Sequence, residues 1–101
     1  MKLQQLEAFI WITRLGSFAA AAERLGITQP TISQRIRELE QQLGVPVFKR
    51  VGRRAQLTDQ GRGLVPLADD MLGLRERILH TVADPASISG TVRLGVAELV
   101  A

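Results

Sequence analysis

The sequence contains no cysteine and no tyrosine, and it has only one histidine and one tryptophan. Without cysteine the chain can form no disulfide framework, no thiolate zinc site and no cysteine nucleophile, a composition that suits a reducing cytosol. It has no apolar run that approaches the length of a membrane span, and its first residues lack the apolar segment of a signal peptide. These absences predict a soluble, intracellular protein with no membrane partner.

The residues that commonly carry catalysis are also scarce. His80, the only histidine, falls near the end of a long helical pattern, where a cation is favourable in any protein. Asp69 and Asp70 are adjacent on that pattern and point about 100° apart, which suits a solvated face better than a shared metal. No carboxylate pair has a nucleophile or a base beside it. We therefore expect no enzyme, no catalytic residue and no metal site.

What the chain does have is a concentrated basic charge. The 101 residues carry a net charge of +3, and 46% of them are hydrophobic, which indicates a folded domain. Within residues 49–62 a single aspartate accompanies five cations, namely Lys49, Arg50, Arg53, Arg54 and Arg62. Residues 64–84 hold more acidic than basic side chains. A basic patch confined to one short segment predicts a polyanionic partner such as nucleic acid.

The first helical pattern extends from Leu3 to Leu15. One side of it carries Leu3, Leu6, Phe9, Ile10 and Thr13. This spacing predicts a helix whose apolar stripe faces the core. Trp11 and Ile12 lie off the stripe, and we expect Trp11 to pack against a neighbouring element rather than bind a ligand.

An Ala-rich segment followed by a polar one has the pattern of a helix, a tight turn and a second helix, over about residues 18–37. Ser17 can cap the first helix, and Gly26 suits the left-handed residue that ends it. Thr28 can cap the second helix, and Pro30 falls in its first turn, where a missing N–H costs little. This pattern of caps and turn residues therefore predicts a helix-turn-helix.

The second helix of this pair has two different faces. The residues of its apolar face recur at helical spacing and are Ile32, Ile36, Leu39 and Leu43. The opposite face carries short or amide side chains and then a cation, a combination that can contact base edges and phosphates in a major groove. The candidate DNA-binding residues here are Thr28, Gln29, Pro30, Thr31, Ser33, Gln34 and Arg37. A polar helix face is more often simply solvated, so this interpretation depends on the residues after this helix.

After Gly44, two short apolar segments are joined by a basic turn that contains glycine. The segments are 45–48 and 57–58, and together they predict a β-hairpin, or wing, over about 45–58. Three helices and a basic hairpin make a winged helix-turn-helix over residues 1–58, a mainly α fold with a small β wing. The wing adds Arg50, Arg53 and Arg54 to the candidate DNA-binding residues. A basic turn can also be merely solvated, but two independent features now indicate the same partner.

Several linked motifs form an ordered set that runs without a gap from about residue 3 to residue 83. They are Leu6…Phe9, Gly16-Ser17-Phe18…Ala21-Ala22…Leu25, Gln29-Pro30…Ser33…Ile36-Arg37…Leu39-Glu40, Leu43-Gly44-Val45…Phe48…Arg50 and Arg53/Arg54…Leu57-Thr58…Gly61. Together they resemble the amino-terminal region of LysR-type transcriptional regulators. The resemblance implies control of transcription, with Gln29, Pro30 and Ser33 at the major groove and Arg53 nearer the minor groove. Gln34 departs from the arginine frequent in the family, and glutamine prefers adenine where arginine prefers guanine.

Residues 59–83 carry a long helical pattern that Thr58 can cap, with Pro66 predicting a kink or a local opening inside it. Its apolar face is too broad for a lone solvated helix, so we expect it to be buried against a second subunit. Packing onto its own head is the alternative for part of this face. The expected dimerisation residues are Leu64, Val65, Ala68, Met71, Leu72, Arg75, Ile78, Leu79 and Val82. The resemblance agrees, because in the family this linker helix pairs antiparallel with that of another subunit.

The pattern of residues 84–101 predicts a hinge followed by the start of a further domain. Residues 84–90 have the composition of a hinge, and 91–101 contain one alternating strand that cannot fold alone. We interpret 91–101 as the start of a truncated effector-binding domain in a longer protein. For the full-length protein the resemblance implies a small-molecule effector and a contact with RNA polymerase, with no cofactor in this fragment.

The leading hypothesis is a sequence-specific regulator that binds an inverted repeat in double-stranded DNA. It would act as a homodimer or homotetramer in the cytoplasm, at the nucleoid. The alternative is a helical protein-interaction module, in which the long helix mediates assembly and the head is only a structural cap. The basic wing, which assembly does not need, distinguishes the two hypotheses.

Overall fold

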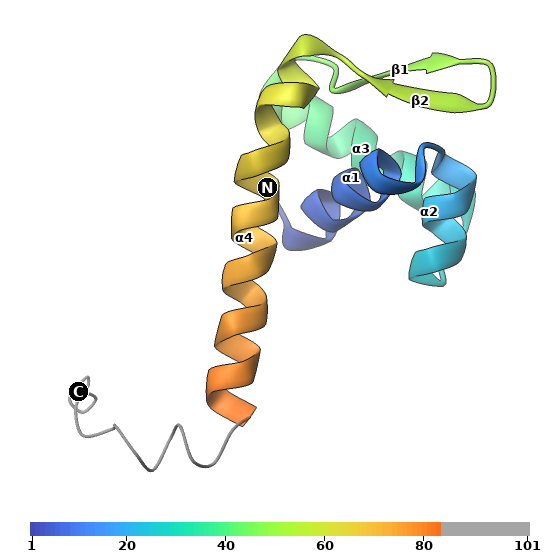
Figure 1. Cartoon of the computed structure of the whole chain (residues 1–101). Coiled ribbons are helices and arrows are strands. Elements are labelled where there is room, and N and C mark those ends of the chain that lie inside the picture. The colour runs from blue at the N-terminus through green and yellow to red at the C-terminus, as the bar shows by residue number, and fades with distance from the viewer. Residues whose placement is uncertain (84–101) are drawn as a thin grey trace.

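The computed structural model describes residues 1–83, which form four helices and one two-stranded antiparallel sheet. The elements are α1 (Leu3–Leu15), α2 (Phe18–Leu25), α3 (Gln29–Leu43), β1 (Phe48–Val51), β2 (Arg54–Leu57) and α4 (Asp59–Ala83). Figure 1 shows the first three helices and the hairpin beside the first half of α4, whose second half extends away from them. The predicted winged helix-turn-helix is confirmed. The hinge and the effector domain predicted over 84–101 lie outside the described residues.

The helices α2 and α3 have the caps that the sequence predicts. The Ser17 side chain accepts a hydrogen bond from the Ala20 N–H at 3.1 Å, at the start of α2. Gly26 ends that helix in the left-handed conformation, with a φ of 69°. The Thr28 side chain then accepts from the Thr31 N–H at 3.2 Å, at the start of α3. Local interactions alone therefore define where both helices of the pair begin and where the first one ends.

Helix α1 is the centre of residues 1–58, which we call the head, and it contacts α2, α3 and α4. Its buried apolar residues are Leu6, Ala8, Phe9, Ile10 and Ile12. The predicted one-sided stripe is wrong at its margins, because Ile12 is completely buried and Leu3 is 40% exposed. Three helices surround α1, so burial is not confined to one side of it. Trp11 packs against the core as predicted.

The hairpin is attached to the bundle at the start of its first strand, and also through the Ala55 N–H on β2, which donates to the Gly16 carbonyl at 3.0 Å. The Phe48 ring is buried, with its centroid 5.3 Å from that of Phe9 and 5.7 Å from that of Phe18. On α3, one carboxylate oxygen of Glu40 accepts hydrogen bonds from the backbone N–H groups of Val47 at 2.8 Å and Phe48 at 3.4 Å. The aromatic contacts therefore hold the wing to α1 and α2, and the Glu40 carboxylate holds it to α3, the helix that is expected to contact DNA.

The two strands pair only from Phe48 onward, whereas the sequence predicted the first strand over 45–48. The turn contains only Gly52 and Arg53, and Gly52 has a φ of 63°, which glycine adopts without strain. Val47, just before β1, gives its N–H to a carboxylate on α3.

Helix α4 is continuous through Pro66, so no local opening interrupts it there. Thr58 caps it as predicted, because its side chain accepts a hydrogen bond from the Gly61 N–H at 3.1 Å. Gly61 is buried, and a Cβ at this position would overlap the carbonyl oxygen of Val47. The first turn of α4 therefore sits directly against the base of the hairpin. Within residues 1–83, no helix combines the length and the apolar character needed to cross a membrane.

Candidate nucleic-acid interface

The N-terminal half of α3 presents a polar face to solvent. Of the residues predicted to contact DNA from this helix and its cap, the exposed ones are Thr28, Gln29, Pro30, Thr31, Gln34 and Arg37. Ser33 is half-buried, while the apolar residues Ile32, Ile36 and Leu39 are buried as predicted. The first turn of a helix also leaves backbone N–H groups without helical partners, which favours a phosphate there. This end of α3 therefore combines side chains that can contact bases with backbone groups that can contact phosphate.

Two side chains of this face bond to each other, and one of them also bonds to Glu38, which was not among the predicted site residues. Arg37 donates from Nη2 to the side-chain oxygen Oε1 of Gln34 at 2.7 Å, and Gln34 donates from Nε2 to the Glu38 carboxylate at 3.2 Å. Glu38 also accepts a hydrogen bond at 3.2 Å from Gln5 on α1. The bonds from Gln34 and then Gln5 lower the pKa of the Glu38 carboxyl below its ordinary range. The sequence pattern of α3 does not indicate a role for Glu38, because that role depends on its contact with Gln5 on α1.

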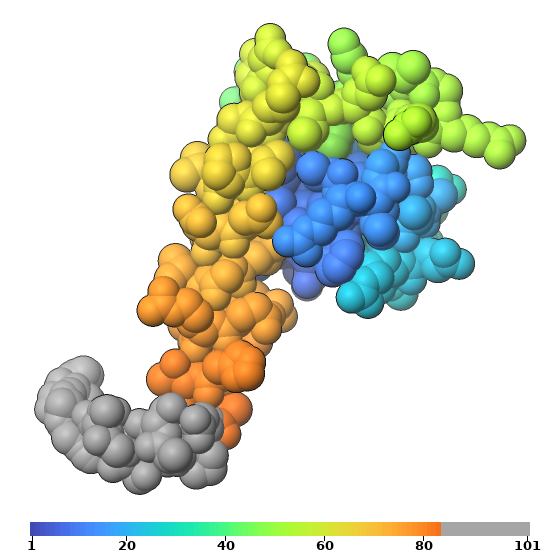
Figure 2. All heavy atoms as spheres, in the orientation of Figure 1, coloured from blue at the N-terminus to red at the C-terminus, as the bar shows by residue number. Residues whose placement is uncertain are grey.

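The wing presents its three predicted arginines in two ways. Arg53 and Arg54 are exposed at the turn of the hairpin, and Figure 2 shows the end of the hairpin projecting beyond the helices. Within residues 1–83, neither of these two cations forms an ion pair. Arg50 is also exposed, but its guanidinium lies 4.1 Å from the centre of the Phe18 ring, in a cation–π contact. Two of the three wing arginines are therefore exposed at the turn, and the third is oriented by its contact with α2.

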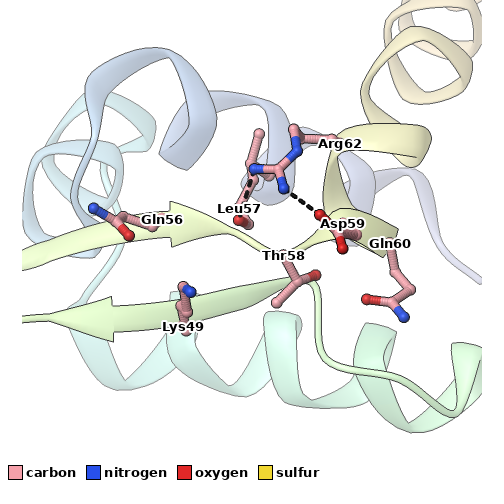
Figure 3. Close-up of a pocket in the computed structure, with 7 residues that line it drawn as sticks. All are labelled: Lys49, Gln56, Leu57, Thr58, Asp59, Gln60 and Arg62. Atoms are coloured by element: carbon pink, nitrogen blue, oxygen red, sulfur yellow. Dashed lines mark hydrogen bonds and ion pairs between the residues drawn. The ribbon is translucent and has the colours of Figure 1, made fainter.

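A polar groove lies between the hairpin and the start of α4 (Figure 3). Its lining residues are Lys49, Gln56, Leu57, Thr58, Asp59, Gln60 and Arg62. Arg62 forms an ion pair with Asp59 and donates to the Leu57 carbonyl at 3.4 Å, so its charge is already engaged at the start of the helix. Among the residues that the structure describes, no group of three histidine, aspartate or glutamate side chains could hold a metal ion.

From Leu67 onward, α4 carries apolar side chains that the head does not cover. Those between 48% and 65% exposed are Leu67, Met71, Leu74, Ile78, Leu79 and Val82. An apolar groove runs between α4 and the start of α1, where Leu3 lies near Met71, Leu74, Ile78 and Leu79. Leu67 and Leu74 were not among the predicted dimerisation residues, whose spacing also takes in residues that pack against the head.

The remaining residues predicted for a dimer interface are engaged within the chain. Ala68 is 1% exposed in the core, which corrects its assignment to a subunit interface. Leu64, Val65 and Leu72 are partly buried and pack against that core. Arg75 lies 4.0 Å from Glu7 on α1, within ion-pair distance. The apolar face of α4 is thus divided, because the side nearest α1 is used by the head.

Known proteins share both the sequence and the fold. The profile described as "Bacterial regulatory helix-turn-helix protein, lysR family" matches residues 3–62. An uncharacterized HTH-type transcriptional regulator in the ibpB-leuC intergenic region of Azotobacter vinelandii is 50% identical over 76 residues, covering 75% of this chain and 53% of that protein. The HTH-type transcriptional activator CmpR of Synechocystis is 36% identical over 93 residues, covering 91% of this chain and 31% of that protein.

Among solved structures, the crystal structure of the CbnR_DBD–DNA complex superposes with a TM-score of 0.73 at 38% identity, covering 76% of this chain and 88% of that one. This chain spans about half the length of the first relative above and about a third of the second. The matched region includes the helix-turn-helix and the wing, where the polar face of α3 and the unpaired arginines lie. The chain therefore belongs to the lysR family of bacterial regulatory helix-turn-helix proteins, a family of transcription regulators rather than of enzymes.

Proposed function

We propose that this chain is the DNA-reading part of a transcription regulator, and that it binds an inverted repeat in double-stranded DNA as a homodimer or homotetramer. The observation that carries the proposal is the exposed polar face of α3 on the same head as a wing with two unpaired arginines. In this arrangement the cations and the start of α3 contact phosphates and supply affinity. Gln29, Ser33 and Gln34 contact base edges and supply specificity.

The uncovered half of α4 supports the dimer. Its exposed apolar side chains follow one helix face instead of being scattered singly over the surface, as they are on a typical monomer. A second copy of α4 would cover them, and an isologous pair places the two α3 helices about a two-fold axis. Because the protein then has two-fold symmetry, its operator has matching half-sites separated by about one helical turn or a multiple of it.

The wider role rests on the same assignment. Since the proposed partner is DNA, we place the protein in the cytoplasm, at the nucleoid, and we assign it no catalytic activity. We also propose that 84–90 is a hinge and that 91–101 begins an effector-binding domain that responds to a small molecule. The relatives, which are longer than this chain, support that interpretation. Contact with RNA polymerase would belong to the full-length protein.

Selection from a randomised pool of duplexes tests the proposal directly. The chain is incubated with the pool at two salt concentrations, and the retained DNA is sequenced. We expect an enriched inverted repeat, and we expect Gln29→Ala or Ser33→Ala to change the enriched sequence more than the affinity. Binding that is sensitive to salt but enriches no motif would refute sequence-specific reading. It would favour the helical interaction module, whose assembly depends on α4 alone.

A further inference from the structure

A chain of hydrogen bonds connects the first turn of α1 to the exposed face of α3. Gln5, which is 5% exposed, accepts a bond at 3.1 Å from the backbone N–H of Lys2 through its side-chain oxygen. Its amide nitrogen donates to one oxygen of Glu38 at 3.2 Å. The other oxygen of Glu38 accepts from the amide nitrogen of Gln34 at 3.2 Å. The buried amide of Gln5 on α1 is therefore linked through Glu38 to the exposed amide of Gln34 on α3.

The direction of these bonds is set by the chemistry of the groups. A backbone N–H only donates, so Gln5 turns its oxygen to Lys2 and its nitrogen to Glu38. An ionised carboxylate only accepts, so Gln34 has to turn its nitrogen toward Glu38. The Arg37 guanidinium only donates, and it contacts the oxygen of the Gln34 amide at 2.7 Å. The amide of Gln34 is thus held in one of its two orientations from both ends.

This orientation leaves Gln34 a particular set of free groups. A primary amide has two N–H donors and two acceptor lone pairs, and Glu38 and Arg37 each occupy one. One donor and one acceptor remain, which is the pair that adenine needs at N7 and N6 in the major groove. Guanine offers two acceptors there, so it would need two donors from the same side chain. The fixed amide therefore suits adenine better than guanine.

We propose that Glu38 is a positioning residue for base recognition, which holds the Gln34 amide in one orientation and so sets a preference for adenine over guanine at the base facing Gln34. This inference rests on the proposed function, because it requires that α3 lie in the major groove. It adds to that function a residue that touches no base itself.

The test measures the ratio of affinities for two operators that differ only by adenine or guanine at the position facing Gln34. The operator is the sequence enriched by the wild-type chain, and Gln34→Ala identifies the position. A good bidentate contact discriminates between bases by roughly 5-fold to 150-fold, so we expect Glu38→Gln to lower the ratio about tenfold. Glu23→Gln removes the same charge from an exposed site on α2 and should leave the ratio unchanged.

A second variant separates the loss of the hydrogen bonds from the loss of the negative charge. Glu38→Asp keeps the carboxylate but is one methylene shorter, so it cannot reach Gln5 and Gln34 together, and we expect the same loss of discrimination. In a Gln34→Ala background, Glu38→Gln should change nothing further. The proposal is overturned if the Glu38 variants keep the wild-type ratio, or if Gln34→Ala itself leaves that ratio intact. A wild-type chain that binds every duplex equally would instead refute the proposed function.

Discussion

Gly61→Ala is expected to destabilise the head at the joint between the hairpin and α4. An added Cβ would overlap the carbonyl oxygen of Val47 and would lie 3.0 Å from Leu57 Cδ2 and 3.1 Å from the Val47 carbonyl carbon. Because the obstacle is backbone, the helix has to move away from the hairpin. Such overpacking costs up to about 3 kcal/mol, and alanine recovers about 1 kcal/mol of helix propensity. We therefore expect a net loss of about 2 kcal/mol, or about 8 to 16 °C in Tm for a domain of this size.

Gly63→Ala is the matched control, since it lies on the same helix with nothing within 4 Å of its Cβ position. It is expected to stabilise the protein by about 0.5 to 1 kcal/mol. Both variants are compared with the wild type by thermal unfolding followed by circular dichroism. Several protein concentrations separate the stability of the head from that of a dimer. Equal melting temperatures for the two variants would refute the argument that close backbone contact selects glycine at residue 61.

Three further outcomes are expected. Arg53→Ala should weaken binding to all duplexes by the same factor and flatten the plot of log affinity against log salt by about one unit, measured by fluorescence anisotropy; a loss restricted to one sequence would contradict a phosphate contact. Ile78→Glu places a charge on the exposed half of α4 and should give monomers in sedimentation equilibrium with unchanged helix content, whereas a persisting dimer would exclude this surface as the interface. In the folded protein the pKa of Glu38 is lower than its ordinary value of 4.5, so the ionised carboxylate stabilises the fold. This stabilisation is fully present above pH 4.5 and is lost as the pH falls through the lowered pKa of the folded state. Urea titrations at pH 7 and pH 3 should therefore show a larger loss for the wild type than for Glu38→Gln, and equal losses would show that the carboxylate is not engaged.

The helices were predictable because their ends depend on neighbouring residues. Ser17, Gly26, Thr28 and Thr58 each act within a few residues of their own position, so the sequence alone indicates where those helices start or stop. The burial of α1 was less predictable. Ile12 lies off the apolar stripe but is covered, because the number of helices around α1 is a property of the tertiary fold.

The candidate site divides in the same way. The exposure of Gln29 and Pro30 is a consequence of the phase of α3, which the apolar stripe of that helix fixes. The partners of polar side chains cannot be deduced from phase. The cation–π contact of Arg50 with Phe18 and the bond from Gln5 to Glu38 join segments more than 30 residues apart. A pattern read along one helix contains no information about such contacts.

The peptide groups of Val47 have a consequence for the DNA as well. The N–H of this residue bonds to Glu40 on α3, and its carbonyl accepts the Thr58 N–H, at the start of α4, at 3.0 Å. In the proposed dimer, α4 joins the two copies and α3 contacts the bases, so these bonds restrict the movement of one helix relative to the other. One base pair inserted between half-sites turns one of them by about 36° around the duplex and moves it by about 3.4 Å, which a joint held on both sides cannot absorb. Binding sites for this protein should therefore diverge during evolution by base replacement far more readily than by insertion or deletion.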